Sequence, residues 1–122
     1  MDNVICHWEI PSENPADLKN FYGNLFNWNI MQGDCMEDTR DYHVCDVGEN
    51  GVWGAIDKVS KPNSGMLVYI TVDDLDAYEK KIVELGGEIL KSKQPIKNTG
   101  NYSQFSDPHG NVMGIFQPLI KQ

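Results

Sequence analysis

The sequence predicts an α+β fold built from two copies of one βαβββ module. The chain of 122 residues has the length of about one domain. Its two halves match each other at a constant shift, and each half combines stretches of period two with one stretch of helical spacing. With 40% hydrophobic and 23% charged residues, the composition is that of a folded protein.

The internal match has a shift of 60 residues and runs from the first predicted strand to the last. The matched pairs are Ile10 and Ile70, Leu25 and Leu85, Ile30 and Leu90, Tyr42 and Tyr102, Val52 and Val112, Gly54 and Gly114, and Ile56 and Phe116. We therefore expect one domain over residues 1–122, with one module in 1–59, a linker in 60–65 and a second module in 66–122.

The first module opens with a strand at residues 4–10, where apolar and polar positions alternate. Asn14 is placed to cap a helix with Pro15 in its first turn, and Asn27 ends that helix. The helix carries an apolar stripe at spacings of three and four, made of Leu18, Phe21, Tyr22, Leu25 and Phe26. Three further strands are expected at 28–32, 42–47 and 52–57.

The second module repeats this order. A strand at 66–72 leads to a helix capped by Asp73 or Asp74, and Gly86 and Gly87 end the helix. The apolar side of this helix consists of Leu75, Tyr78, Ile82 and Leu85. Strands are expected at 88–91, 102–106 and 112–117, with a tight turn at 107–111 between the last two.

Each helix has to bury its stripe on one face of a sheet. The face with Trp8 and Ile10 is the better helix partner in the first module, which leaves His7 and Glu9 on the opposite face. The corresponding opposite face of the second module carries Leu67, Tyr69 and Thr71. If the two sheets join edge to edge and curve, these faces line the central cavity of an incomplete, strongly curved mixed-sheet barrel, which is a typical small-molecule site.

Charge and composition argue against several other classes. The net charge is −8 and Arg40 is the single arginine, whereas binding to nucleic acid or anionic lipid needs a basic surface. No apolar run has the roughly 20 residues of a membrane helix, and no secretion signal is visible. The three cysteines lack CxxC spacing, so we expect a reduced, cytoplasmic protein. The acidic cluster Asp34, Glu37, Asp38 and Asp41 lacks the spacing of a calcium loop.

Three segments resemble the vicinal oxygen chelate superfamily of glyoxalases, bleomycin-resistance proteins and extradiol dioxygenases. They are HWEIPSENPADLKNFYGNLFNW, YITVDDLDAYEKKIVELGG and QFSDPHGNVMGIFQP. The resemblance covers nearly the whole chain. It implies the two-module fold around a cavity, a small-molecule ligand and a homodimer.

The resemblance also implies where a divalent metal would be held in the metal-dependent members. The four ligand places fall on His7, Leu67, Gly54 and Gly114, and only the histidine has a donor atom. Because such a site needs about three protein ligands, we predict no metal and no other cofactor. A relocated divalent metal held by His7, Glu9 and either His43 or Asp46 is the alternative.

The candidate catalytic residues are His7 and Glu9, which share a strand face. A carboxylate on an apolar wall is expected to have a raised pKa, which suits a general base. The candidate ligand-binding residues are His7, Glu9, Trp53, Tyr69, Gln104 and Phe116. Tyr69 is expected to donate a hydrogen bond to Glu9 or a ligand, Trp53 to stack and Gln104 to anchor polar groups, while a purely structural role is the alternative for each. His43 fits either face of its strand, and His109 is expected in an exposed turn.

These residues predict a metal-free protein that binds a small molecule, similar to the bleomycin-resistance branch. The acidic surface favours a cationic ligand. The alternative is a lyase, isomerase or dioxygenase-type enzyme that uses Glu9 as base or a relocated metal. A third possibility is a role in stability or assembly.

Overall fold

The computed structural model describes residues 1–33, 41–59 and 65–119. Its elements are, in chain order, β1 (Ile5–Ser12), α1 (Pro15–Phe26), β2 (Asn29–Gln32), β3 (Tyr42–Asp46), β4 (Gly54–Lys58), β5 (Leu67–Thr71), α2 (Leu75–Glu84), β6 (Glu88–Ile96), β7 (Gly100–Ser106) and β8 (Val112–Pro118). Strand, helix and three strands follow one another twice, so the predicted α+β class and the two βαβββ modules are confirmed. The predicted linker lies outside the described residues, except for Gly65. No helix in the described ranges is long and apolar enough to cross a membrane.

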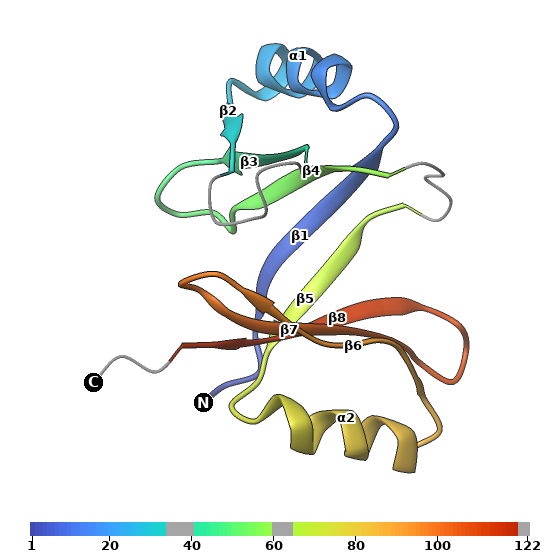
Figure 1. Cartoon of the computed structure of the whole chain (residues 1–122). Helices are drawn as coiled ribbons and strands as arrows, with labels where there is room; N and C mark the ends of the chain where they lie inside the picture. Colours follow the sequence, from blue (N-terminus) through green and yellow to red (C-terminus); the bar gives the residue numbers. More distant parts are fainter. Residues whose placement is uncertain (34–40, 60–64, 120–122) are drawn as a thin grey trace. The chain divides into compact units, whose positions relative to one another are not determined.

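The chain forms two compact units. The first unit consists of the described residues between His7 and Leu67, and its strands lie in the order β2-β3-β4-β1 (Figure 1). The second unit consists of Met1–Cys6 and the described residues from Val68 onward, with the order β5-β8-β7-β6. The first strand of each module runs parallel to the last one, and the other neighbours within each unit are antiparallel.

The N-terminal residues pack with the second unit because they hydrogen-bond to β5. The Thr71 amide donates to the Val4 carbonyl at 2.9 Å, and the Asn3 side-chain amide donates to the Thr71 carbonyl at 2.9 Å. The division between the two units therefore falls inside β1 and β5.

The core of the first unit lies between α1 and one face of its sheet (Figure 1). Ile30, Cys45 and Ile56 are buried there, and Trp8 and Ile10 pack against them. This is the strand face that the sequence assigns to the helix, and that prediction is confirmed.

Helix α1 begins and ends where the sequence predicts. Asn14 is the N-cap residue with Pro15 directly after it, and Asn27 ends the helix with a positive φ of 62°. However, the Asn14 side chain caps no backbone amide and instead donates to Asp17 Oδ2 at 3.2 Å.

The predicted apolar stripe of α1 is only partly buried. Leu18 and Tyr22 pack against the core. Phe21, Leu25 and Phe26 are each more than half exposed, so the expectation that the whole stripe faces the sheet is wrong for these three residues. The five apolar positions span a wider arc of the helix than one sheet face covers. Phe21 and Leu25 flank a shallow, open hollow on this outer side of α1.

The second unit is built on the same plan. Its core consists of Val72, Leu75 and Ile115, with Tyr78 and Ile82 of α2 packed against it. Of the two predicted caps, Asp74 is the N-cap residue, and its carboxylate accepts from the Ala77 amide at 3.2 Å.

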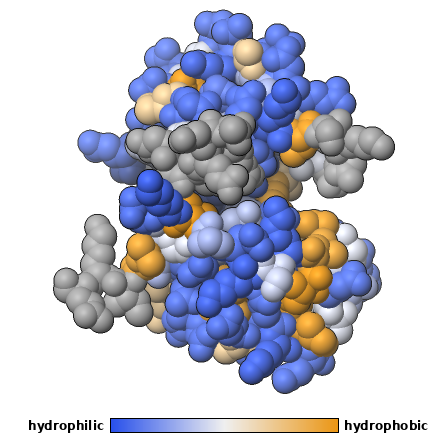
Figure 2. All heavy atoms as spheres, viewed as in Figure 1, coloured by the Kyte–Doolittle hydropathy of each residue, from blue (hydrophilic) through white to orange (hydrophobic). Residues whose placement is uncertain are grey.

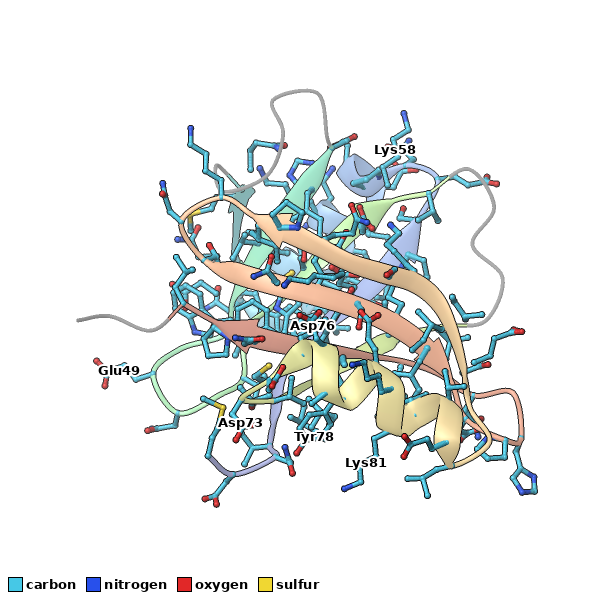
Figure 3. All side chains as sticks on the ribbon, turned by 60° about the horizontal axis from the view of Figure 1, so that its bottom comes forward. Glu49, Lys58, Asp73, Asp76, Tyr78 and Lys81 are labelled. Carbon is cyan, nitrogen blue, oxygen red and sulfur yellow. The ribbon has the colours of Figure 1, made fainter. Side chains whose placement is uncertain are left out.

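Two side chains connect α2 to other parts of the second unit. Asp76 pairs with Lys93 of β6 at 3.4 Å, and the Tyr78 hydroxyl donates to Asn3 Oδ1 at 3.3 Å. Figure 3 labels Asp76, Tyr78 and Lys81 along this helix. Figure 2 shows that hydrophilic side chains dominate the face of the molecule in that view, with hydrophobic groups between them.

Candidate functional site

Strand register brings four polar side chains of the first unit to one face of its sheet. Glu9 of β1 lies beside Ala55 of β4, and Asp57 of β4 lies beside Tyr42 of β3. His7 is two residues before Glu9, so it points to the same side of β1. This is the face opposite α1, as the sequence predicts for His7 and Glu9.

Three of these side chains form a hydrogen-bonded cluster, which we call the Glu9–Tyr42–His7 cluster. The Tyr42 hydroxyl donates to Glu9 Oε2 at 2.6 Å. The same hydroxyl lies 2.6 Å from His7 Nε2, and His7 Nε2 lies 3.7 Å from Glu9 Oε2. The His7 and Tyr42 rings are nearly parallel, with centroids 6.3 Å apart.

The carboxylate and the tyrosine of the cluster are buried, whereas the histidine is partly exposed. Glu9 is 8% exposed and Tyr42 is 5% exposed, whereas the His7 side chain is 30% exposed. A buried carboxylate needs hydrogen-bond donors to offset the loss of water, and the Tyr42 hydroxyl is such a donor. Glu9 is therefore buried within the cluster and not solvated.

The corresponding face of the second unit carries Tyr69 and Phe116 at the places of the carboxylates Glu9 and Asp57. Tyr69 is buried, and its hydroxyl accepts from the Gln104 side-chain amide at 2.9 Å. The Tyr102 ring packs edge-on to Tyr69, with centroids 6.0 Å apart, and Phe116 lies beside Tyr102 in the sheet register. Lys91 Nζ lies 5.8 Å from the centre of the Tyr102 ring. Tyr69, Gln104 and Phe116 thus share one sheet face.

Comparison with known proteins agrees with this architecture. The family model of the Glyoxalase/Bleomycin resistance protein/Dioxygenase superfamily matches residues 4–115. The chain belongs to this superfamily. The resemblance of the three sequence segments is therefore confirmed.

Individual members of the superfamily are similar at lower levels. "Putative glyoxylase CFP32" of Mycobacterium bovis is 26% identical over 113 residues, which cover 89% of this chain and 43% of that protein. This chain thus spans less than half the length of the curated relatives it matches.

Two solved structures share the fold. Methylmalonyl-CoA epimerase from Mycobacterium tuberculosis has a TM-score of 0.72 and 12% identity, with 95% of this chain and 88% of that one covered. Protein BH1468 from Bacillus halodurans has a TM-score of 0.73 and 11% identity, with 100% and 99% covered.

In this member of the glyoxalase superfamily, the last strands of the two modules, β4 and β8, do not match each other as the sequence predicts. A side chain at Gly54 would meet the Trp8 ring, so Gly54 faces α1, whereas a side chain at Gly114 would meet the Tyr69 ring. The residue of β4 that corresponds to Gly114 is therefore Ala55, which lies beside Glu9. The constant shift of 60 is wrong for this strand, where the structural shift is 59, because the two modules differ by one residue in the segment between β3 and β4 and its counterpart.

Ala55 therefore takes the ligand place that the sequence assigned to Gly54, and alanine also lacks a donor atom. Ala55 and Gly114 have no atom that binds a metal, and His7 Nε2 lies against the Tyr42 hydroxyl. The described residues contain no group of three or more His, Cys, Asp or Glu side chains that could hold a metal ion. The residues present at these places do not fit the metal of the metal-dependent superfamily members.

The alternative of a relocated metal takes either His43 or Asp46 as its third ligand. His43 pairs in register with Ile56 of the core, so it lies on the α1 side of the sheet, and its Nε2 contacts Asp41. The structure therefore does not bring His43 together with His7 and Glu9. Asp46 accepts a hydrogen bond from the Gly48 amide at 2.9 Å, at the end of β3.

The remaining histidine and tryptophan candidates lie outside the cluster. His109 is exposed in the turn before β8, as predicted. Trp53 precedes β4 instead of lying within a strand, so the predicted strand start at residue 52 is wrong. Trp53 is 45% exposed, and its indole N–H donates to the Gly48 carbonyl at 2.9 Å.

Sequence reasoning missed Tyr42 and Asp57 as members of the site. Tyr42 appears in the internal match only as a counterpart of Tyr102. Its position at the start of a strand that pairs with β4 could have indicated proximity to β1, because β4 lies between the two strands.

For the acidic cluster of the sequence, Asp34, Glu37 and Asp38 lie outside the described residues, as does Cys35.

Proposed function

We propose that this chain binds a small organic molecule on the first-unit face that carries the Glu9–Tyr42–His7 cluster, without a divalent metal. The observation that carries the proposal is a buried carboxylate held by a tyrosine hydroxyl at 2.6 Å, with an imidazole beside it. Polar groups that are fixed in place on an otherwise packed wall are typical of ligand sites, where they orient the bound molecule.

The charge of this face favours a cationic ligand. Glu9 and Asp57 share the face, and residues 7–67 contain ten Asp or Glu and four Lys or Arg. A surplus of negative charge raises the local concentration of cations and speeds their association. We therefore propose a ligand with an ammonium, amidinium or similar group attached to an aromatic or aliphatic body.

Further contacts are proposed for the apolar part of the ligand. Trp53 of the first unit is exposed enough to stack on a planar group. The ligand contacts expected for Tyr69, Gln104 and Phe116 stay predictions, because these residues belong to the second unit. Stacking on such rings contributes about 0.5–1.5 kcal/mol beyond the burial of area.

A thermal-shift comparison tests this proposal. Cationic aromatic compounds are screened against neutral compounds of the same shape, and a ligand at 100 times its Kd should add about 2.7 kcal/mol to the stability. Glu9→Gln should abolish the preference for the cation. Glu13→Gln is the matched control, since it removes the same charge from an exposed residue of the same unit. Equal effects of the two substitutions would contradict the proposed site, and no response to any compound would favour an assembly role.

A second candidate function is an enzyme that uses Glu9 as general base, in a lyase or isomerase reaction. The specific observation is that the Glu9 carboxylate and His7 are joined through one hydroxyl, which is an arrangement that can pass a proton. One structural neighbour is named as an epimerase, although this likeness shows the fold alone. If Glu9 is the base, Glu9→Gln should slow turnover by about 10²-fold or more while ligand binding persists.

The remaining expectations are proposals of the same kind. A dioxygenase-type activity through a relocated metal predicts stoichiometric nickel, zinc or iron in the purified protein, lost in His7→Ala. We also propose a homodimer without nucleic-acid or membrane partners in the cytoplasm. Light scattering measures the oligomeric state directly.

A further inference from the structure

We infer that Tyr42 is a positioning residue that fixes the proton of His7 on Nε2 and thereby sets the hydrogen-bonding character of the Glu9–Tyr42–His7 cluster. The inference deepens the proposed function, because it names the residue that decides what this face offers to a ligand.

The Tyr42 hydroxyl has a single proton to donate. Glu9 Oε2 lies 2.6 Å from that hydroxyl, and an ionised carboxylate has only acceptor atoms. The tyrosine proton therefore goes to Glu9. A hydrogen bond from a hydroxyl to a charged acceptor is about twice as strong as one between neutral groups, which favours this direction over the opposite one.

The position of the His7 proton follows. His7 Nε2 also lies 2.6 Å from the Tyr42 oxygen, and this oxygen has only lone pairs left once its proton points to Glu9. Two facing lone pairs at that distance would repel each other, so Nε2 must carry a proton and donate it to the tyrosine oxygen. The chain of donors then runs from His7 through Tyr42 to Glu9.

The opposite direction requires a different protonation state of Glu9. If Tyr42 donated to His7 Nε2, its oxygen would face the Glu9 carboxylate with no proton between them at 2.6 Å. That arrangement is stable only with a protonated Glu9.

Two consequences follow for the chemistry of the face. In the neutral ring the other nitrogen, Nδ1, is an acceptor, so His7 and the carboxylates Glu9 and Asp57 are acceptors of the same kind. This agrees with a ligand that carries donors. In addition, Nε2 has no lone pair for a metal, although it is the His7 nitrogen that lies 3.7 Å from Glu9. A metal ion shared by His7 and Glu9 through this nitrogen would first have to displace the Tyr42 hydroxyl.

Nitrogen-15 NMR of the histidine rings tests the inference without any ligand. We expect the wild-type protein, near neutral pH, to show His7 with its proton on Nε2, and this proton to give a resolved signal because the hydrogen bond to Tyr42 slows its exchange with water. Tyr42→Phe should abolish the resolved Nε2 proton signal. A proton on Nδ1 in the wild type, or an unchanged Nε2 proton signal in Tyr42→Phe, would overturn the inference.

Tyr102→Phe is the matched control. Tyr102 is the counterpart of Tyr42 in the second unit and is also buried, but its contacts are with Tyr69 and Lys91. Its substitution should leave the His7 proton signal unchanged. His7→Gln identifies the signal by its loss. If Tyr42→Phe fails to fold, the wild-type proton position alone decides the inference. Failure to find a ligand would count against the proposed function and leave the measured proton position intact.

Discussion

Gly54→Ala tests the assignment of β4 to its two faces. A methyl group at this position would lie 2.0 Å from Trp8 Cδ2 and 2.3 Å from Cε2 and Cε3, whereas ordinary contact begins at 3.4 Å. The Trp8 ring would therefore have to move by about 1.4 Å. It is held by a hydrogen bond from its indole N–H to the Val52 carbonyl at 2.8 Å and by the Trp28 ring, with centroids 5.4 Å apart.

The cost has two parts. Overpacking of a filled core costs about 1–3 kcal/mol, and loss of the indole hydrogen bond costs about 1 kcal/mol. We expect Gly54→Ala to lower the free energy of unfolding by about 2–4 kcal/mol. At about 4 °C per kcal/mol for a domain of this size, the Tm falls by about 8–16 °C.

Urea denaturation measures this change, and Gly23→Ala is the control. Gly23 lies within α1, and the nearest atom to an added methyl group is the Trp28 carbonyl oxygen at 3.8 Å. Alanine should raise stability there by about 0.5–1 kcal/mol, because glycine is a poor helix residue. Wild-type stability for Gly54→Ala would refute the placement of Gly54 against Trp8 and restore the constant shift of 60 residues.

Three further predictions concern Tyr42 in the cluster, Gly114 in the second unit and the buried Cys45. Tyr42→Phe should lower the free energy of unfolding by about 1.5–3 kcal/mol, because it takes a hydrogen bond from a buried carboxylate; Tyr102→Phe should cost clearly less in the same urea titration. Gly114→Ala should displace the Tyr69 ring, which a new methyl group would approach to 2.3 Å, and a lower free energy of unfolding in urea reports this change. Burial raises the pKa of the Cys45 thiol to about 11 from an ordinary value of 9.0. Since the pKa of Cys45 is higher in the folded state than in the unfolded state, the contribution of the neutral thiol to stability is complete below pH 9 and is lost between about pH 9 and 11. Cys45→Ala should therefore flatten the dependence of stability on pH in that window.

Much of the fold could be predicted from the sequence because local signals agreed with one another. Alternation in β1 assigned Trp8 and Ile10 to the helix side, and both pack there. The end of α1 followed from Asn27, which takes the positive φ that few other residues tolerate. The outer side of α1 could not be predicted in the same way, because hydrophobic spacing alone does not show how wide a strip of helix the sheet covers. Phe21 and Leu25 satisfy the spacing and are exposed all the same.

Only the site residues that lie on one strand could be predicted to share a face. His7 and Glu9 are two residues apart, so their common face follows from strand geometry. Tyr42 is 33 residues from Glu9 in sequence, and its place depends on the order of β3, β4 and β1 in the sheet. The face of Gly54 required the register of β4, which a one-residue change reverses, because successive side chains of a strand point to opposite sides.

The two modules show how one scaffold acquires two different surfaces. Tyr42 and Tyr102 occupy corresponding buried places, while the first strand of the module, one strand further along the sheet, carries Glu9 in one module and Tyr69 in the other. In the first unit the tyrosine hydroxyl meets a carboxylate and an imidazole. In the second unit the Tyr102 ring meets another aromatic ring, and the amide of Gln104 donates to the Tyr69 hydroxyl. The exchange of Glu9 for Tyr69, together with that of Asp57 for Phe116, thus separates a face with carboxylates from an aromatic one. Since the backbone around both is alike, exchange of these residues, Glu9→Tyr with Tyr69→Glu, should move the preference for cations with the carboxylate, and retention of that preference by the unaltered Asp57 alone would contradict the role given to Glu9.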